Sequence, residues 1–362
     1  MLQGKNQITI RQTLIIFFIS IFSPAIRILP NIGARLGHEA LWLGPLIASL
    51  ALFMIFDVLG QIFKNDNVGN LGDFFELSMG KLIGVLIRFI YLIWIFILYL
   101  IYTRYYAERL VTSIFKDTDI RFFLLVMMIV VFIAIRGRLE VFTRFCEISF
   151  LIFTAITAMF FIFLLPSVRV ENIYPLTDQD IIPAIKSTYP VLGLWGYMTF
   201  FMFLGDHIKD KNQITKYRNK YTIFLAISTS ILLIILVGSL GYRIVMRMSL
   251  PFFNANKMIT FAASLDRLES ILLSVWVITD FIIITAFATI ITHITKGIFK
   301  LSCVKHLSFP VALAGYYGSL MLAGSRFEIE VFSKEIALMI NIILGFIIPV
   351  VAFGIGKLRK KI

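Results

Sequence analysis

Residues 83–102 of the chain, IGVLIRFIYLIWIFILYLIY, contain a single charged side chain, Arg88. A second run, FFLLVMMIVVFIAI at residues 122–135, contains none. A helix needs about 20 consecutive apolar residues to cross the bilayer core, which is about 30 Å thick. The first run meets this length, and similar runs recur from the N-terminus almost to the C-terminus. The chain is therefore predicted to be an all-α, polytopic integral membrane protein.

The composition of the whole chain supports this class. Of its 362 residues, 59% are hydrophobic and only 15% are charged, which lies outside the range of soluble globular domains. Because apolar spans take most of the length, we expect a single transmembrane domain over residues 1–362. The net charge of +13 is interpreted as cytoplasmic Lys and Arg that set membrane orientation, so no nucleic-acid partner is expected.

Ten apolar spans are predicted, with polar, turn-forming connectors between them. Their approximate ranges are 9–30, 39–62, 81–110, 119–136, 140–166, 184–207, 218–243, 266–296, 307–323 and 335–357. Lys and Arg are more frequent in the connectors that share a side with the N-terminus, so both termini are expected in the cytoplasm. The first apolar run leads into Arg27–Pro30 rather than a small-residue cleavage site, which predicts a retained helix and not a signal peptide.

The two halves of the chain invite comparison. In several transporter folds the halves are inverted repeats of five helices, and the first helix of each half is broken near the midplane. Ser23–Pro24–Ala25 interrupts the first span, and the sixth span contains Pro190, Gly193 and Gly196. Because proline removes a backbone donor and glycine is a weak helix former, both spans are predicted to be broken around a central site. Proline and glycine are also common in membrane helices, so ordinary packing is the alternative explanation.

Ionisable side chains inside an apolar span cost roughly 2.5–3.5 kcal/mol when unpaired, so each requires an explanation. Asp280 lies near the middle of the eighth span with no charged neighbour in sequence, and Arg27 and Arg88 lie in the first and third spans. Asp280 is predicted to face the bundle interior, where it pairs with an arginine or binds a proton or cation. The alternative is a static ion pair that fixes helix packing.

The remaining polar residues indicate no chemistry. Arg104, Glu108 and Arg109 end the third span at helical spacing and are interpreted as interfacial packing pairs. Cys146 and Cys303 lie far apart and outside any C-x-x-C pattern, so neither a disulfide nor a zinc site is predicted. The four histidines have no metal-ligand spacing, and no phosphate-binding glycine loop or nucleophile elbow is present. The sequence therefore predicts no enzyme, no cofactor and no metal.

Residues 265–277, LDRLESILLSVWV, resemble the acidic-Arg-x-Glu-Ser-x5-Trp segment of the spore germination permeases, the B-type subunits of germinant receptors. Three further stretches are similar to this family: Leu29–Pro30 at the end of the first helix, residues 80–108 along the third, and MFLGDHIK at residues 202–209. The resemblance extends over nearly the whole chain in the number and length of its spans. Only the eighth-span segment is specific to the family.

The resemblance implies a fold, a location and partners. The family belongs to the amino acid–polyamine–organocation superfamily, which implies ten helices in a leucine-transporter-like 5+5 inverted repeat with broken first and sixth helices. It also implies a receptor for small germinants, often amino acids, in the spore inner membrane, with an A-type membrane subunit and a C-type lipoprotein as partners. The implied ligand pocket lies between the first, third, sixth and eighth helices, at Ser23, Pro24, Ala25, Trp94, Leu98, Gly193, Trp195, Gly196, Ile283 and Phe287.

Two features depart from the family. Ser23–Pro24–Ala25 is poor in glycine, whereas relatives usually have a glycine-rich first break whose backbone N–H groups can hold a carboxylate. Either a ligand carboxylate is held differently here, with help from Arg27 or the Ser23 hydroxyl, or the ligand is not a simple amino acid. Asp280 is the second feature that the family does not lead us to expect.

Three functions are open at this point. The first is a sensor that binds a small germinant at the midplane and signals to partner subunits to start germination. The second is a secondary transporter of amino acids or amines, driven by protons through Asp280. The third is a membrane scaffold that binds no ligand and assembles the other two subunits. One fold serves both sensor and transporter, so the fold does not decide between them.

Overall fold

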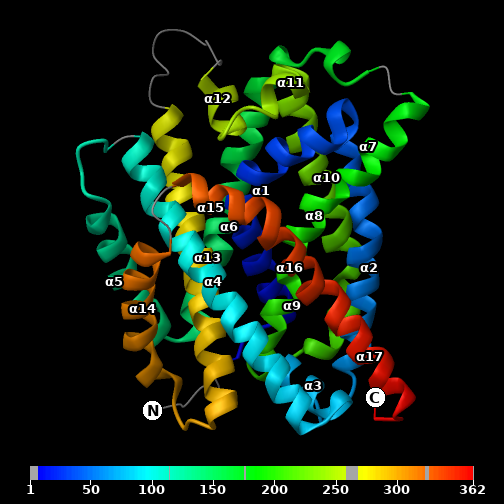
Figure 1. Cartoon of the computed structure of the whole chain (residues 1–362), viewed down its shortest axis with the longest axis vertical. Helices are drawn as coiled ribbons and strands as arrows, with labels where there is room; N and C mark the ends of the chain where they lie inside the picture. The colour runs from blue at the N-terminus through cyan, green and yellow to red at the C-terminus, as the bar shows by residue number, and fades with distance from the viewer. Residues whose placement is uncertain (1–6, 114, 175–176, 258–267, 323–325, 362) are drawn as a thin grey trace.

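A computed structural model describes residues 7–113, 115–174, 177–257, 268–322 and 326–361. Helices dominate these ranges, whose one β contact is an isolated parallel bridge between Ile8 and Ile208. The α-helices (Figure 1) are α1 Ile10–Gly37, α2 Gly44–Ile62, α3 Leu71–Met79, α4 Lys81–Ser113, α5 Ile120–Arg136, α6 Leu139–Leu164, α7 Ile181–Lys186, α8 Thr188–Trp195, α9 Tyr197–Phe201, α10 Ile214–Leu240, α11 Tyr242–Val245, α12 Pro251–Lys257, α13 Leu268–Phe299, α14 Ser308–Met321, α15 Arg326–Phe332, α16 Leu338–Ile342 and α17 Ile348–Leu358.

Within the described ranges, 6 helical runs are long and apolar enough to cross a membrane, judged by length and composition. They are Ile10–Ile62, Lys81–Thr112, Leu139–Ser167, Lys211–Leu240, Ser270–Phe299 and Phe327–Leu358. The first run contains both α1 and α2. The other predicted spans coincide with shorter helices, namely α5 with 17 residues, α14 with 14 residues, and the pair α8–α9. The chain is thus an all-helical membrane protein, as its sequence predicts.

Helix α1 lies inside the bundle, where it contacts α13, α6, α10 and α8 (Figure 1). Its side chains are buried over almost its whole length. The two ends of the described chain lie near α3. At the N-terminal end, the Ile10 backbone N–H donates to Asp210. The next residue, Lys211, donates to the carbonyl of Gly69, just before α3. The side chain of Asn65 donates to the carbonyl of Lys361. Figure 1 shows α3 and the end of α17 at one end of the bundle, with α7, α11 and α12 at the other.

The predicted break in the first helix is wrong. α1 begins at a capping box formed by Thr9 and Gln12 and continues through Ser23–Pro24–Ala25 to Gly37. Pro24 removes only one i→i−4 hydrogen bond, and the turns on both sides of it remain buried against neighbouring helices. Membrane helices tolerate proline for this reason, because the surrounding structure holds the helix together.

The sixth span is segmented. α8 ends at Trp195, a turn at Gly196 precedes α9, and a 3-10 helix at Met202–His207 follows. Its two glycines allow close approach to the last helix: a Cβ on Gly196 would lie 2.6 Å from the carbonyl oxygen of Asn341, and one on Gly193 would lie 2.6 Å from Leu338. In this structure both glycines therefore contact α16 rather than an open pocket.

The last helix contains two π-helical turns, Ser333–Ala337 and Ile343–Ile347, which separate α15, α16 and α17. A π turn leaves a carbonyl without its usual partner, and such turns are frequent at functional sites. In the second turn these carbonyls accept side-chain hydrogen bonds. Tyr91 of α4 donates to Leu344 at 2.5 Å, and Thr199 of α9 donates to Gly345 at 2.6 Å. The last helix is thereby tied to α4 and α9.

Candidate functional site

A buried ion pair joins α4 and α13 in the interior of the bundle. Arg109 Nη1 lies 3.0 Å from Asp280 Oδ2, and these side chains are only 7% and 3% exposed. The Ser23 hydroxyl of α1 donates to Asp280 Oδ1 at 2.5 Å, and Arg109 Nη2 donates to Ser23 Oγ at 3.3 Å. Three helices that are distant in sequence therefore meet at one carboxylate.

Asp280 pairs with Arg109 rather than with Arg27 or Arg88, the two arginines that the sequence suggested. The interpretation of Arg109 as an interfacial residue is wrong, because its side chain is buried. Its neighbours Arg104 and Glu108 form an i,i+4 pair at 2.9 Å. Residue i+5 lies about 140° around a helix from residue i, so Arg109 points away from the face of Arg104.

Arg27 lies one helical turn after Ser23 and shares its face of α1. Its guanidinium stacks on the ring of Tyr105 at 3.4 Å from the centroid, and the residue is 7% exposed. Among the described residues, Nη1 of Arg27 has no hydrogen-bond partner. Arg27 also lies within electrostatic reach of Asp280, whose carboxylate already binds Arg109. At this position the described interior thus places two arginines beside one carboxylate.

A chain of hydrogen bonds links α4, α9 and α16 near Arg27. The hydroxyls of Tyr102 and Tyr197 lie 2.8 Å apart and share a hydrogen bond. Asn341 donates to the Tyr197 hydroxyl at 3.3 Å and accepts from the Trp94 indole N–H at 2.8 Å. Of this group only Trp94 was predicted from the sequence, because tyrosines in apolar spans resemble ordinary core residues. An asparagine within the tenth span is the polar signal that points to the rest.

The other side chains predicted to line the ligand pocket are buried and packed together. Four of them are at most 1% exposed: Leu98, Trp195, Ile283 and Phe287. The Phe287 ring centroid lies 5.3 Å from that of Tyr197 and 5.8 Å from that of Tyr102. Within the described ranges these four side chains are almost fully shielded from solvent, so a ligand reaches them only when the helices move apart.

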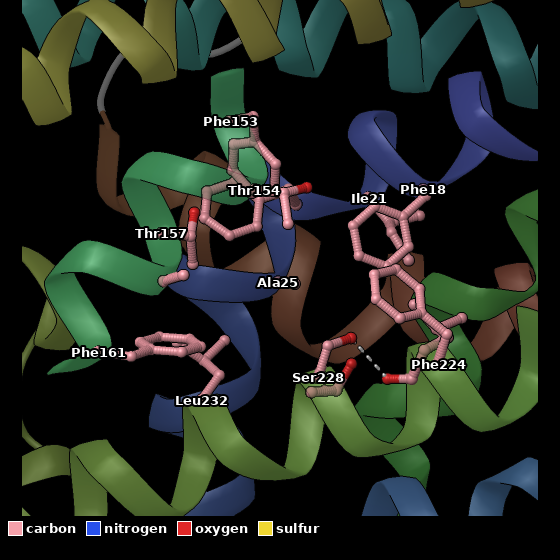
Figure 2. A pocket seen from close by; sticks show the side chains of 14 residues that line it. Phe18, Ile21, Ala25, Phe153, Thr154, Thr157, Phe161, Phe224, Ser228 and Leu232 are labelled. Atoms are coloured by element: carbon pink, nitrogen blue, oxygen red, sulfur yellow. Dashed lines mark hydrogen bonds between the residues drawn. The ribbon is translucent and has the colours of Figure 1, made fainter. Parts of the chain in front are cut away.

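An apolar cavity of about 140 Å³ lies along α1, between α6 and α10. Figure 2 shows Ala25 of α1 near this cavity, with Phe153 and Thr157 of α6 and Leu232 of α10 around it. Its lining is almost entirely hydrocarbon, so the cavity suits no charged ligand. Ala25 is the predicted pocket residue that lines it.

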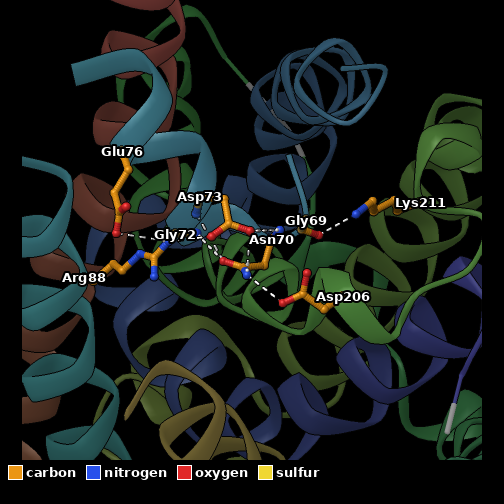
Figure 3. A network of polar contacts seen from close by, with 8 residues as sticks. All are labelled: Gly69, Asn70, Gly72, Asp73, Glu76, Arg88, Asp206 and Lys211. Atoms are coloured by element: carbon orange, nitrogen blue, oxygen red, sulfur yellow. Dashed lines mark hydrogen bonds and ion pairs between the residues drawn. The ribbon is translucent and has the colours of Figure 1, made fainter. Parts of the chain in front are cut away.

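Arg88 belongs to a second polar cluster, at the end of the bundle that contains α3 (Figure 3). Its Nη2 lies 2.6 Å from Asp73 and 3.3 Å from Glu76, both on α3. Asn70 caps α3 by accepting from its first backbone N–H groups, and its side-chain amide donates to Asp206 at 2.7 Å. Arg88 therefore holds α3 against α4 and takes no part in the Asp280 pair.

The family-like segment at residues 265–277 falls partly outside the described residues, since residues 258–267 are not described. In its described part, Trp276 lies beside the ion pair, with its ring centre 4.5 Å from the Arg109 guanidinium. The tryptophan of this segment is therefore in contact with the buried charges. Within the described ranges, no three His, Cys, Asp or Glu side chains are grouped as metal ligands.

Apolar helices packed around a buried ion pair and a tyrosine–asparagine network define a polytopic, all-helical membrane protein. The chain belongs to the spore germination protein family, whose sequence profile matches residues 7–326. Aligned over 365 residues, it is 21% identical to Spore germination protein KB of Bacillus subtilis (strain 168). The alignment covers 99% of this chain and 96% of that protein. The resemblance predicted from the sequence is thus confirmed, and the similarity extends almost from end to end.

Proposed function

We propose that this protein is the B-type subunit of a spore germinant receptor. In this role it binds a small germinant at the centre of the bundle and signals to an A-type membrane subunit and a C-type lipoprotein. Membership of the spore germination family and similarity to Spore germination protein KB support this role. The apolar helical runs support a location in the bilayer, which we assign to the spore inner membrane with both termini cytoplasmic.

In this proposal the chain forms one domain over residues 1–362 and crosses the membrane ten times. The crossings are α1, α2, α4, α5, α6, α8–α9, α10, α13, α14 and α15–α17. The first five and the last five form an inverted repeat of the leucine-transporter type, in which α8–α9 is the broken helix of the second half. Pro24 gives α1 a weak point at the matching position, because it removes one backbone hydrogen bond.

The observation that carries the proposal is the surplus positive charge at Arg27. Arg27 and Arg109 lie beside a single carboxylate, Asp280, in the described interior. Lys334 of the last helix does not add to this surplus of positive charge, because it pairs with Glu330 at 3.4 Å. An unpaired charge inside a membrane costs roughly 2.5–3.5 kcal/mol, so an anionic ligand that pairs with Arg27 removes a cost that the free protein bears.

A carboxylate is the anion that suits this position. Nη1 of Arg27 has no hydrogen-bond partner among the described residues, so it can donate a charge-assisted hydrogen bond to a ligand carboxylate. Asp280, which Ser23 and Arg109 hold in place, can attract a ligand ammonium group. The site therefore offers a separate position for each charge of an amino acid.

The germinant is surrounded in this proposal by the pocket residues predicted from the sequence and by the buried network beside Arg27. These are Ser23, Pro24, Ala25, Trp94, Leu98, Gly193, Trp195, Gly196, Ile283 and Phe287, together with Tyr102, Tyr105, Tyr197 and Asn341. Because the region is closed in the structure, the germinant binds an opened arrangement of the helices. The signal is then limited by the difference in its affinity for the two arrangements.

Binding and uptake measured in parallel test this proposal. Purified protein in liposomes is incubated with a panel of ¹⁴C-labelled amino acids, alone and with the A- and C-type subunits. A receptor binds at least one amino acid saturably without accumulating it in the lumen. Arg27→Gln should weaken this binding about tenfold or more, because it removes a charge-assisted contact. The exposed Arg121 provides the matched control, and Arg121→Gln should leave binding unchanged.

The same assay separates the other functions. The carboxylate of Asp280 inside the bundle favours a proton-coupled transporter as the second candidate, although Asp280 must leave Arg109 before it can exchange a proton. Accumulation that collapses with the proton gradient and is lost in Asp280→Asn would replace the receptor by a transporter. A complete lack of binding, even with the partner subunits present, would refute both and leave a scaffold.

A further inference from the structure

A polar cavity of about 430 Å³ lies at the end of the bundle that contains α3, away from the Asp280 site. It is enclosed by α4, by the 3-10 helix that follows α9, and by the last turns of α13. The residues that line it are Asn70, Arg88, Phe203, Asp206, His207, His293, Ile294, Lys296, Gly297, Lys300 and Leu301. Nothing in the proposed germinant site uses this cavity.

The carboxylates around the cavity already have partners. Asp206 accepts a hydrogen bond of 2.7 Å from the Asn70 side chain, and Asp73 accepts 2.9 Å and 2.6 Å bonds from Asn70 and Arg88. Figure 3 shows Asp206 and Asp73 gathered around Asn70, and Glu76 beside Arg88. The hydrogen bonds therefore hold these carboxylates on the α3 side of the cavity.

The opposite side of the cavity is cationic. Lys296 lies in the last turn of α13, and the exposed Lys300 follows directly after that helix. Neither forms an ion pair within the described ranges. Two like charges that line the same cavity repel each other, so an anion between them lowers this electrostatic cost. The rings of His207 and His293 add two imidazoles, with centroids 4.6 Å apart. Arg88 Nη1 approaches from α4, beside Gly297.

Membrane orientation alone accounts for lysines at helix ends that do not line this cavity, as at Lys305 and Lys360. It does not account for lysines, histidines and a buried arginine that converge on one hollow. We propose that this cavity is an anion site that binds a phosphate group, with Lys296, Lys300 and Arg88 as its charged donors. Basic pockets between membrane helices at this level bind phospholipid head groups, and the same donors suit free phosphate.

Occupancy of the site would act on the germinant site through α13. The phosphate would bridge the end of α13 to α4 and to the 3-10 helix after α9, and α13 carries Asp280 on the same rigid element. A ligand here therefore favours one packing of α13 against α9 and α4, which carry the tyrosines of the tyrosine–asparagine network.

Two sources of phosphate are tested separately on the full-length protein. In neutral detergent, the thermal unfolding midpoint is measured with inorganic phosphate, against sodium chloride at equal ionic strength. In nanodiscs of phosphatidylcholine, it is measured with and without phosphatidylglycerol. Lys296→Gln/Lys300→Gln is compared with Lys305→Gln/Lys360→Gln, which removes the same charge from exposed positions outside the cavity. If the first pair does not fold, Lys300→Gln is compared with Lys305→Gln.

We expect one of the two phosphate sources to raise the unfolding midpoint of the wild type by about 3 °C or more. The cavity variant should lose most of this shift and the control variant should keep it. A shift with inorganic phosphate identifies a soluble ligand, and a shift with phosphatidylglycerol alone identifies a lipid head group. The proposal is overturned if neither source shifts the midpoint, or if the two variants respond alike.

Discussion

Asp280→Asn isolates the contribution of the buried ion pair to stability. The change keeps the size of the side chain and leaves an oxygen that can still accept from the Ser23 hydroxyl, which lies 2.5 Å from the carboxylate. What disappears is the negative charge opposite Arg109. Arg109 then lacks the carboxylate with which it pairs in the wild type.

The expected cost follows from the burial of the pair. With side chains that are 7% and 3% exposed, solvent screens the charges very little. Breaking a buried ion pair by removing one partner costs about 3–5 kcal/mol, because the remaining charge is uncompensated. We expect the lower end of this range, about 3 kcal/mol, since the amide retains the Ser23 hydrogen bond.

An exposed pair on the same protein gives the matched control. Arg218 pairs with Asp57, and these side chains are 34% and 42% exposed. Such a pair is worth about 0–1 kcal/mol, so Asp57→Asn should cost little. The free energy of unfolding should therefore fall by at least about 2 kcal/mol more in Asp280→Asn than in Asp57→Asn.

Denaturation of the purified protein in mild detergent, followed by tryptophan fluorescence, measures both variants. Trp276 reports on the site directly, because its ring centre lies 4.5 Å from the Arg109 guanidinium. Arg109→Met in the Asp280→Asn background should recover part of the loss, since it removes the charge that Asp280 balanced. Equal losses in Asp280→Asn and Asp57→Asn, or no recovery in the double variant, would refute the reasoning.

Gly196→Ala places a Cβ 2.6 Å from the Asn341 carbonyl oxygen and should lower the free energy of unfolding by about 1–3 kcal/mol. Gly354→Ala, whose Cβ would have nothing within 4 Å, should be neutral. Equal effects of the two variants in denaturation would show that Gly196 has no packing role. Tyr197→Phe removes two hydroxyl hydrogen bonds inside the bundle and should cost about 1–3 kcal/mol in the same assay; an unchanged midpoint would show that the network does not stabilise the fold. Asn70→Ala removes the cap of α3 and should cost about 0.5–2 kcal/mol, with faster amide exchange confined to the first turn of α3; protection that does not change would contradict the capping role.

The helices were largely predictable because hydrophobicity over about 20 residues is a local signal. The predicted spans 81–110 and 140–166 correspond to α4 at Lys81–Ser113 and α6 at Leu139–Leu164. The continuity of α1 through Pro24 was not predictable, because whether a proline ends a helix depends on the helices packed around it. The π turns of the last helix also depend on tertiary contacts, which are invisible in sequence.

The candidate site was only partly predictable, because it consists of pairwise contacts between side chains from helices that are distant in sequence. Mid-span position identified Asp280 as a residue in need of a partner, but its choice of Arg109 over Arg27 depends on how α4 and α13 rotate against each other. Tyr197 and Asn341 belong to the site through their mutual hydrogen bond, which no spacing reveals. Sequence patterns therefore identify the charged and polar side chains that need a partner inside the bundle, and the packing of the helices decides which of them are in contact.

The most direct test of the account asks whether Arg27 binds the carboxylate of the germinant. The amino acid that binds most tightly in the liposome panel is compared with its carboxamide analogue, in the wild type and in Arg27→Gln. We expect the wild type to prefer the acid by about 100-fold or more, and the variant to bind acid and amide about equally. A variant that keeps the full preference for the acid would contradict the account.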